Sequence, residues 1–285
     1  GLLQIRRYFA EKEIDYDAAG GFECFTNDAA DWIAVDKNLQ WLNEKLQSIT
    51  GEEKTFCKAD EKLEAMGFAG FDHMIETKLE GGLHSGKLVK ALLQKVQNMG
   101  VQVLTNIEVK KFYTKEESII IETTNELNFC ARQLLLCTNA FTKELLPTED
   151  IIPNRGQVLL TNEIDVLKIK GTFHFDKGFY YFRNLGNRLL LGGGRNKAFE
   201  EEETTAMMTT PIIQNELESF IRKHLLPNIP FSITDRWSGI MAMGSEKMPI
   251  VKAIDKNVFC CVRMSGMGVA LAPVVADQVV ELMKK

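Results

Sequence analysis

Apolar and polar positions predict a helix-rich start to the chain. Residues 85–99 carry apolar side chains at helical spacing, with Ser85 as the expected N-cap and Gly100 as the stop. Residues 28–51 form a second predicted helix, capped by Asp28 and ended by Gly51. The chain opens inside helix-like sequence with no capping residue before it, so we expect the natural protein to begin earlier.

After Gly100 the pattern changes to that of β-strands. Residues 101–107 alternate between apolar and polar side chains, which predicts a strand. Residues 108–140 follow as a meander with turns near Glu116 and Asn125. The meander ends in the continuous apolar run QLLLC, which is typical of a strand buried on both faces of a parallel sheet.

The second half of the chain predicts an antiparallel sheet and a closing strand–loop–helix unit. Residues 151–164, 171–195 and 231–243 are rich in aromatic and β-branched side chains, with a hairpin at NLGN. Helices are predicted around Pro211 and Pro273, each proline in the first turn. This order indicates an α/β domain interrupted by an antiparallel substrate domain.

Composition narrows the function classes. The 285 residues carry 34 basic and 39 acidic side chains, a net charge of −5, which argues against a broad nucleic-acid surface. No long apolar run predicts a membrane-spanning helix and no signal peptide is visible, so we expect a cytoplasmic protein. Six cysteines without a CxxC pair predict buried, reduced thiols, and four isolated histidines give no metal site. The acidic run at residues 200–203 is predicted as a solvated face.

The stretch GGLHSGKL is close to a phosphate-binding P-loop. Gly81, Gly86 and Lys87 occupy the motif's positions. Leu88 stands where the motif needs a hydroxyl to hold Mg²⁺, and the residues before it make a poor buried strand. We therefore interpret the stretch as a glycine-rich turn that starts the next helix.

The stretch VRMSGMGVALA is the best candidate for binding chemistry. A strand runs into Gly266 and Gly268 and then into a helix, whose first N–H groups favour negative charge. A full dinucleotide fingerprint needs a small residue at Leu271 and a later acidic residue, so this is not the primary nucleotide-binding turn. The spacing alone fits a helix N-terminus facing a cofactor or a plain tight turn.

From about Gly20 to its end, the chain resembles the FAD-dependent D-amino-acid oxidase/glycine oxidase family. The matching segments follow the family's order: EGGLHSGKLVKALLQKVQNMGVQVLTNIEV, LLLCTNAFTKELLP, IIPNRGQVLLT, FYYFRNLGNRLLLGGGR, RWSGIMAMGSEKMPIV and FCCVRMSGMGVALAPVVADQVVELM. The resemblance implies a discontinuous FAD/NAD(P)-binding-like domain with an inserted antiparallel-sheet substrate domain. Family members also start with a strand and a GxGxxG turn, which this sequence lacks.

The resemblance implies a division into four parts. Residues 1–80 belong mostly to the substrate domain and residues 81–150 to the FAD-binding domain. Residues 151–243 complete the substrate domain, and residues 244–285 complete the FAD-binding domain.

The resemblance also implies which residues contact FAD. Val109 matches a meander residue whose backbone contacts the adenine side, and the family's small closing turn matches Thr138, Asn139 and Ala140. Asn139 stands where glycine is usual, and asparagine tolerates the positive φ that such a turn needs. The loop against the flavin's pyrimidine edge matches Met264, Ser265, Gly266, Met267, Gly268 and Val269.

Four residues are candidates for the substrate side. Tyr180 matches a substrate-site tyrosine, and the neighbouring Tyr181 is expected on the opposite face of its strand. Met241 stands where the family pattern W-G-[LI]-R-P has an arginine that pairs with the substrate carboxylate. Methionine cannot make that contact, so Arg183 or Arg263 is expected to replace it.

The resemblance implies an FAD-dependent amine or amino-acid oxidase or dehydrogenase. Such an enzyme oxidises the C–N bond of a small amine or amino acid to an imine by hydride transfer to flavin N5. Two alternatives are a flavin-dependent demodification of a tRNA base and a non-catalytic binding protein on the same fold. The first of these predicts a basic surface, which the net charge does not favour.

Overall fold

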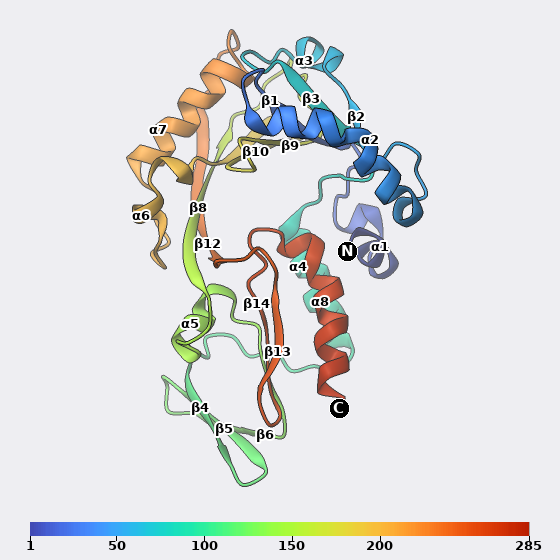
Figure 1. Ribbon diagram of the computed structural model, residues 1–285. Helices are drawn as coiled ribbons and strands as arrows, with labels where there is room; N and C mark the ends of the chain where they lie inside the picture. The colour runs from blue at the N-terminus through green and yellow to red at the C-terminus, as the bar shows by residue number, and fades with distance from the viewer. Residues whose placement is uncertain (285) are drawn as a thin grey trace.

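Two lobes joined by a two-stranded ribbon make up the computed structural model, which describes residues 1–284 (Figure 1). The ribbon consists of β8 (Ile152–Thr161) and β12 (Ile233–Met243), which pair antiparallel along their whole length. One end of the ribbon belongs to the sheet of the upper lobe, and the other end reaches the lower lobe near α5 (Figure 1). The ribbon therefore positions the two lobes relative to each other.

The upper lobe contains an eight-stranded sheet in the order β12-β8-β11-β10-β9-β1-β3-β2. Its other strands are β1 (Gly21–Phe25), β2 (Cys57–Lys58), β3 (His73–Thr77), β9 (Thr172–Phe175), β10 (Tyr180–Leu185) and β11 (Arg188–Gly193). Every neighbouring pair is antiparallel except β1 and β9. The hairpin predicted at NLGN joins β10 to β11 and is confirmed.

Helices cover both faces of this sheet. They are α2 (Ala30–Thr50), α3 (Glu61–Met66), η3 (Arg195–Lys197), α6 (Phe199–Glu202), α7 (Pro211–Phe220) and η4 (Ile221–Leu225). On one face, Ile213 and Leu217 of α7 are completely buried in the main hydrophobic core. On the other face, Trp32 of α2 stacks on His73 of β3, with ring centroids 3.9 Å apart. Each face thus has its own packing.

The lower lobe contains two three-stranded sheets. The first has the order β13-β14-β7 and consists of β13 (Ile250–Asp255), β14 (Val258–Val262) and β7 (Leu134–Leu136). The second has the order β4-β5-β6 and consists of β4 (Val109–Lys115), β5 (Ser118–Thr123) and β6 (Asn128–Ala131). The remaining helices are α1 (Leu2–Tyr8), η1 (Glu11–Glu13), α4 (Ser85–Asn98), η2 (Asn139–Phe141), α5 (Thr142–Leu145) and α8 (Gly268–Met283). Val275 and Val279 of α8 pack against Phe259 and Cys261 of β14. The predicted parallel pairing of the apolar run is confirmed, because β7 pairs parallel with β14.

Residues 101–107 do not form the predicted strand. Val101, Val103 and Leu104 are 52%, 42% and 60% exposed. An alternating pattern makes a strand only where another strand accepts its backbone hydrogen bonds, and the described part of the chain supplies none here. The prediction was wrong because it relied on local pattern alone.

The helix boundaries correct three predictions. His84, not Ser85, caps α4, and its side chain accepts a hydrogen bond from the Lys87 backbone N–H. Asp28 does not cap α2, which has Ala29 at its N-cap and no side-chain cap bond. Pro273 lies inside α8 and not in its first turn, because the glycine loop enters the helix directly at Gly268.

Two predictions about surface and core also change. Glu202 lies in the acidic run predicted as solvated, yet it is 1% exposed and pairs bidentately with Arg155, also buried. All six cysteines are free, but Cys130 and Cys137 are exposed and Cys57 is only partly buried. Composition does not show which acidic residue meets a buried arginine or which cysteine faces outward.

Candidate functional site

The two tyrosines at the start of β10 face opposite sides of the upper sheet. Tyr180 is 3% exposed in the main core, and its hydroxyl donates a 2.6 Å hydrogen bond to Glu216 of α7. Burial and this hydrogen bond raise the pKa of Tyr180. Tyr181 points to the other side, as the alternation predicts. The structure thus assigns Tyr180 to the core, and Tyr181 replaces it as the candidate site tyrosine.

Two glycines lie close to the Tyr181 side chain. A Cβ added to Gly192, its cross-strand partner, would lie 2.4 Å from the tyrosine ring. A Cβ added to Gly156 would lie 3.1 Å from Met241 Cε and 3.4 Å from the Tyr181 hydroxyl. We call Gly156, Tyr181, Gly192 and Met241 the site wall. The glycines leave the space that the two larger side chains occupy.

The site wall meets the glycine loop that precedes α8. A Cβ added to Gly266 would lie 3.6 Å from Met241 Sδ. The Ser265 backbone N–H donates a 3.3 Å hydrogen bond to Ala242 O at the end of β12. The structure therefore brings together Met241 and the loop of residues 264–268, which the sequence analysis assigned to substrate and cofactor respectively.

The loop has the properties of a binding turn. Arg263, Ser265 and Gly266 have φ values of 61°, 50° and 84°, so three of four consecutive residues adopt left-handed backbone. The Ser265 hydroxyl is buried and has no hydrogen-bond partner among the described residues. The N-terminus of α8 follows at Gly268, where helix N–H groups favour an anionic or electron-rich ligand. An orphaned hydroxyl beside a helix N-terminus fits a polar heterocyclic cofactor.

A second turn approaches from the lower lobe. Asn139 adopts φ 49°, which confirms that it tolerates the turn where the family has glycine. Its side-chain amide donates a 2.9 Å hydrogen bond to Ile240 O, next to Met241 in sequence. Thr138 shares a 2.7 Å hydrogen bond with Thr142, and Ala140 is completely buried. The turn of residues 138–140 is therefore anchored to the ribbon beside the site wall.

The remaining predicted residues lie elsewhere or are already bonded. Val109 begins β4, in the sheet drawn at the bottom of Figure 1, away from the ribbon's junction with the glycine loop. Arg263 is buried in the lower lobe and pairs with Asp150 at 2.6 Å, besides donating to Met248 O. The Arg183 side chain donates to the backbone carbonyls of Leu83 and Asn184. Both arginines therefore already have protein partners.

Arg195, which was not among the predicted site residues, contacts the cross-strand partner of Met241. Its Nη1 donates a 3.1 Å hydrogen bond to Asn154 Oδ1. Asn154 is the cross-strand partner of Met241, so the two side chains leave the ribbon on the same face. The sequence feature that could have identified Arg195 is GGGR at the end of a predicted strand, because glycines let an adjacent side chain approach a ligand.

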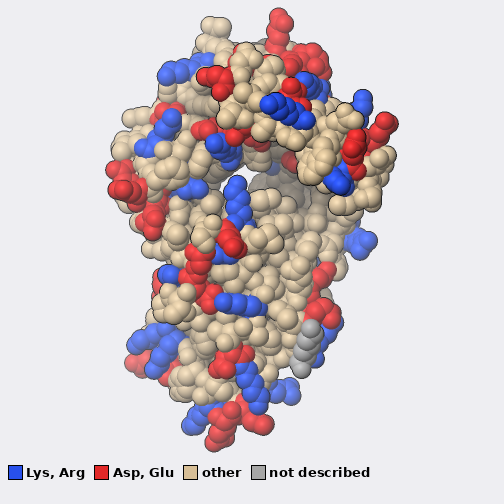
Figure 2. All heavy atoms as spheres, in the orientation of Figure 1, with Lys and Arg blue, Asp and Glu red and all other residues tan. Residues whose placement is uncertain are grey.

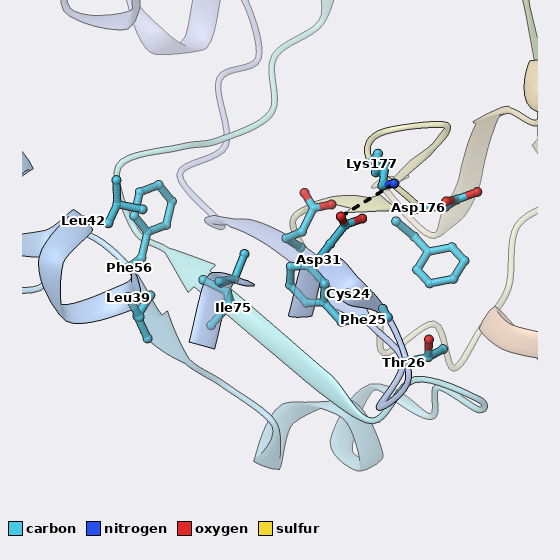
Figure 3. A pocket seen from close by; sticks show the side chains of 14 residues that line it. Cys24, Phe25, Thr26, Asp31, Leu39, Leu42, Phe56, Ile75, Asp176 and Lys177 are labelled. Carbon is cyan, nitrogen blue, oxygen red and sulfur yellow. Dashed lines mark ion pairs between the residues drawn. The ribbon is translucent and has the colours of Figure 1, made fainter. Parts of the chain in front are cut away.

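The molecular surface is hollowed between the two lobes, with Lys and Arg side chains at the edge of the hollow (Figure 2). A separate pocket of about 400 Å³ lies under α2. Asp31 and Lys177 pair at one end of this pocket, and Leu39, Leu42 and Phe56 line the other (Figure 3). The pocket includes none of the residues of the site wall, so it is not the site described above.

Glu23 links the pocket to the face on which Tyr181 lies. Its cross-strand partner is His174, which is in turn the partner of Tyr181. Burial, and then the carboxylates of Glu80 and Asp31, raise the pKa of Glu23 to about 7. Burial lowers the pKa of His174. The sheet face that carries Tyr181 therefore extends from the site wall to the carboxyl group of Glu23 and its acidic neighbours.

The sequence of almost the whole chain matches one family model. The model, described as FAD dependent oxidoreductase (DAO), matches residues 2–282. The chain belongs to this DAO family. FAD is the cofactor of the family, and the loop of residues 264–268 with its orphaned hydroxyl offers a fitting environment for it.

Solved structures of DAO-like proteins share the fold. L-proline dehydrogenase from P. horikoshii superposes with a TM-score of 0.80 at 18% identity, covering 99% of this chain and 76% of that one. Glycine oxidase from Geobacillus kaustophilus gives 0.81 at 16% identity, covering 99% and 78%. L-amino acid deaminase from Proteus vulgaris gives 0.73 at 15% identity, covering 99% and 74%. No curated protein sequence matches the chain.

Among residues 1–284, no helix is both long and apolar enough to cross a bilayer. The same residues contain no group of three or more His, Cys, Asp and Glu side chains that could hold a metal ion.

Proposed function

We propose that this DAO-family protein oxidises the C–N bond of a small amino acid or amine to an imine, using FAD. The observation that carries the proposal is the meeting of the site wall with the glycine loop at Met241 and Gly266. Elements of the two lobes, to which we assign substrate and cofactor binding, meet there. The amino-acid and amine enzymes among the structural relatives support this substrate class.

FAD, when bound, accepts the two electrons released as the C–N bond is oxidised. The N–H groups in the first turn of α8, which begins at Gly268, would favour the negative charge that builds on a reduced cofactor. Thr138, Asn139 and Ala140 would hold the cofactor from the lower lobe, and Val109 would contact its distant end. These residue roles are part of the proposal.

Tyr181 is the proposed substrate hydrogen-bond donor. Burial raises its pKa to about 12, with Arg195 opposing the shift, so the hydroxyl stays protonated at neutral pH. The hydroxyl has no hydrogen-bond partner among residues 1–284, which leaves it free for a ligand. Met241, Gly156 and Gly192 lie close to the Tyr181 side chain.

We also propose that the lobes correspond to functional domains. Residues 1–80 belong mostly to the substrate domain, although α1 and η1 lie in the lower lobe, and residues 151–243 complete it. Residues 81–150 and 244–285 contribute to the FAD-binding domain. The ribbon of β8 and β12 passes between them. In this arrangement the substrate is held mostly by the upper lobe and the cofactor mostly by the lower lobe.

The test is an absorbance spectrum of the purified full-length protein followed by anaerobic titration with amino acids and amines. We expect a flavin band that bleaches with at least one substrate. Tyr181→Phe should lower turnover and keep the flavin band. Tyr180→Phe removes the same atom from the other face of the strand and should leave turnover unchanged.

Two outcomes would contradict the proposal. Absence of a flavin band, even after FAD is added, would contradict the use of FAD as the cofactor. A bound flavin that no amine or amino acid bleaches would favour a binding protein on the same fold.

A further inference from the structure

Among residues 1–284, Arg195 is a cation without a carboxylate partner. Its guanidinium lies 5.2 Å from the ring centroid of Phe179 and 5.3 Å from that of Phe199. The only hydrogen bond from its side chain within residues 1–284 goes to the neutral amide of Asn154. Two aromatic faces and one amide thus fix the guanidinium and leave most of its five N–H donors unused.

Several other arginines in the protein are bonded more completely. Arg155 pairs bidentately with Glu202, and Arg263 pairs with Asp150. Arg236 pairs with Glu218. Arg183 has no ion pair in the described part of the chain, but two of its donor groups bond to backbone carbonyls. Within residues 1–284, Arg195 therefore makes fewer hydrogen bonds to protein acceptors than these arginines do.

The hydrogen bond to Asn154 places the guanidinium of Arg195 next to the site wall. Asn154, which it contacts, is the cross-strand partner of Met241. Arg195 also interacts electrostatically with Tyr181, the other large side chain of the wall. A ligand beside Tyr181 and Met241 would meet a fixed positive charge.

A carboxylate is the ligand group that matches this arrangement. The planar guanidinium fork binds a carboxylate with two parallel hydrogen bonds, and the Tyr181 hydroxyl supplies a third donor. A simple amine lacks the carboxylate, and its ammonium form would be repelled by Arg195. The same side chain can therefore attract one class of substrate and disfavour the other.

We infer that Arg195 binds the substrate's carboxylate beside Met241 and makes the protein selective for α-amino acids over amines that lack a carboxylate. The inference rests on the proposed function and deepens it. It assigns substrate-carboxylate binding to the turn after β11 and not to the β12 position now occupied by Met241.

The experiment compares matched substrate pairs that differ only in the carboxylate, such as proline with pyrrolidine and alanine with ethylamine. In the natural protein, kcat/KM should favour the acid. Arg195→Gln should lower kcat/KM for the acid by roughly 100-fold, mainly through KM, and change the value for the amine little. Arg195→Lys keeps the charge without the fork and should lie between.

Two further variants make the experiment specific. Lys197→Gln removes one positive charge from an exposed position in the same short helix and should change neither substrate's kinetics. Arg195→Gln combined with Met241→Arg should restore part of the preference for the acid, because it returns a guanidinium to the same face. Circular dichroism of each variant checks folding.

A binding measurement separates failure of the inference from failure of the proposed function. In calorimetric titrations with benzoate, a carboxylate that is not oxidised, the natural protein should bind more tightly than Arg195→Gln. Equal binding, or equal loss of acid and amine kinetics in Arg195→Gln, would overturn the role of Arg195 while oxidation of either substrate stood. Benzoate binding that depends on Arg195 in a protein without turnover would support the carboxylate site and reject the oxidation.

Discussion

At the scale of single residues, Glu23 has a carboxyl group whose surroundings oppose its ionisation. Burial, and then Glu80 and Asp31, raise its pKa from 4.5 to about 7. A group with a raised pKa in the folded state contributes stability that is complete below the unfolded value and is lost as pH rises through the folded value. Glu23 should therefore lower the protein's stability progressively between about pH 4.5 and 7.

Glu23→Gln should remove this loss. The melting temperatures of the variant and the natural protein should be similar near pH 4.5, and the variant should become the more stable protein as pH approaches 7 and above. Thermal melts across this range check the prediction. Glu44→Gln, at an exposed position on α2, is the control and should show no such divergence. A constant difference between Glu23→Gln and the natural protein would contradict it.

The residues also show what sequence can predict. Strand alternation correctly placed Tyr180 and Tyr181 on opposite faces, and the tolerance of asparagine for positive φ anticipated Asn139. Sequence could not decide which tyrosine faces the core, because that depends on where α7 packs. It also could not find the Arg155–Glu202 pair, whose members are 47 positions apart.

At the scale of elements, the end of β11 depends on a glycine. Gly193 has φ 120°, and a Cβ there would lie 1.9 Å from Phe179 O. Gly178, in the turn before β10, has φ 81° but open space around it. A comparison of substitutions at the two positions therefore separates the free-energy cost of left-handed backbone from the cost of steric overlap.

Gly178→Ala should cost about 1 kcal/mol of unfolding free energy, the usual cost of left-handed backbone for a residue with a Cβ. Gly193→Ala should cost roughly twice that or more, because the Phe179 carbonyl must also move. Urea unfolding of both variants measures the difference. Equal losses would show that the chain relaxes around Gly193 without resistance.

Elements with local signals were the most predictable. The helices over residues 28–51 and 85–99 and the β10–β11 hairpin needed only periodicity and turn residues. The strand predicted over residues 101–107 failed because a strand is defined by its neighbour as well as by its own pattern. Caps were also missed, since His84 caps α4 through a side chain that composition rules rank low.

At the scale of the whole molecule, the two lobes share their longest strands. Leu159 of β8 is completely buried in the upper core, whereas Ala242 of β12 is buried in the lower core with Ile250. Loss of either core therefore removes support from the same ribbon. We expect the two lobes to unfold together in one cooperative transition.

Two buried thiols test this expectation. Cys24 lies in the upper core and Cys260 in the lower core. Pulsed alkylation across a urea gradient, read by mass spectrometry, should expose both at the same midpoint. The exposed Cys130 should react throughout and serves as the control for labelling. Separate midpoints for Cys24 and Cys260 would show that the lobes unfold independently.

The β8–β12 ribbon has a consequence for redesigning the protein. Adding two residues to each strand between the lobes would lengthen the ribbon by about 7 Å and leave every side chain on its original face. Adding one residue to each would turn Asn154 and Met241 away from the site. Substrate length could thus be engineered in steps of two residues. Variants with one residue added to each strand, in which Asn154 and Met241 face the opposite side, would serve as the control.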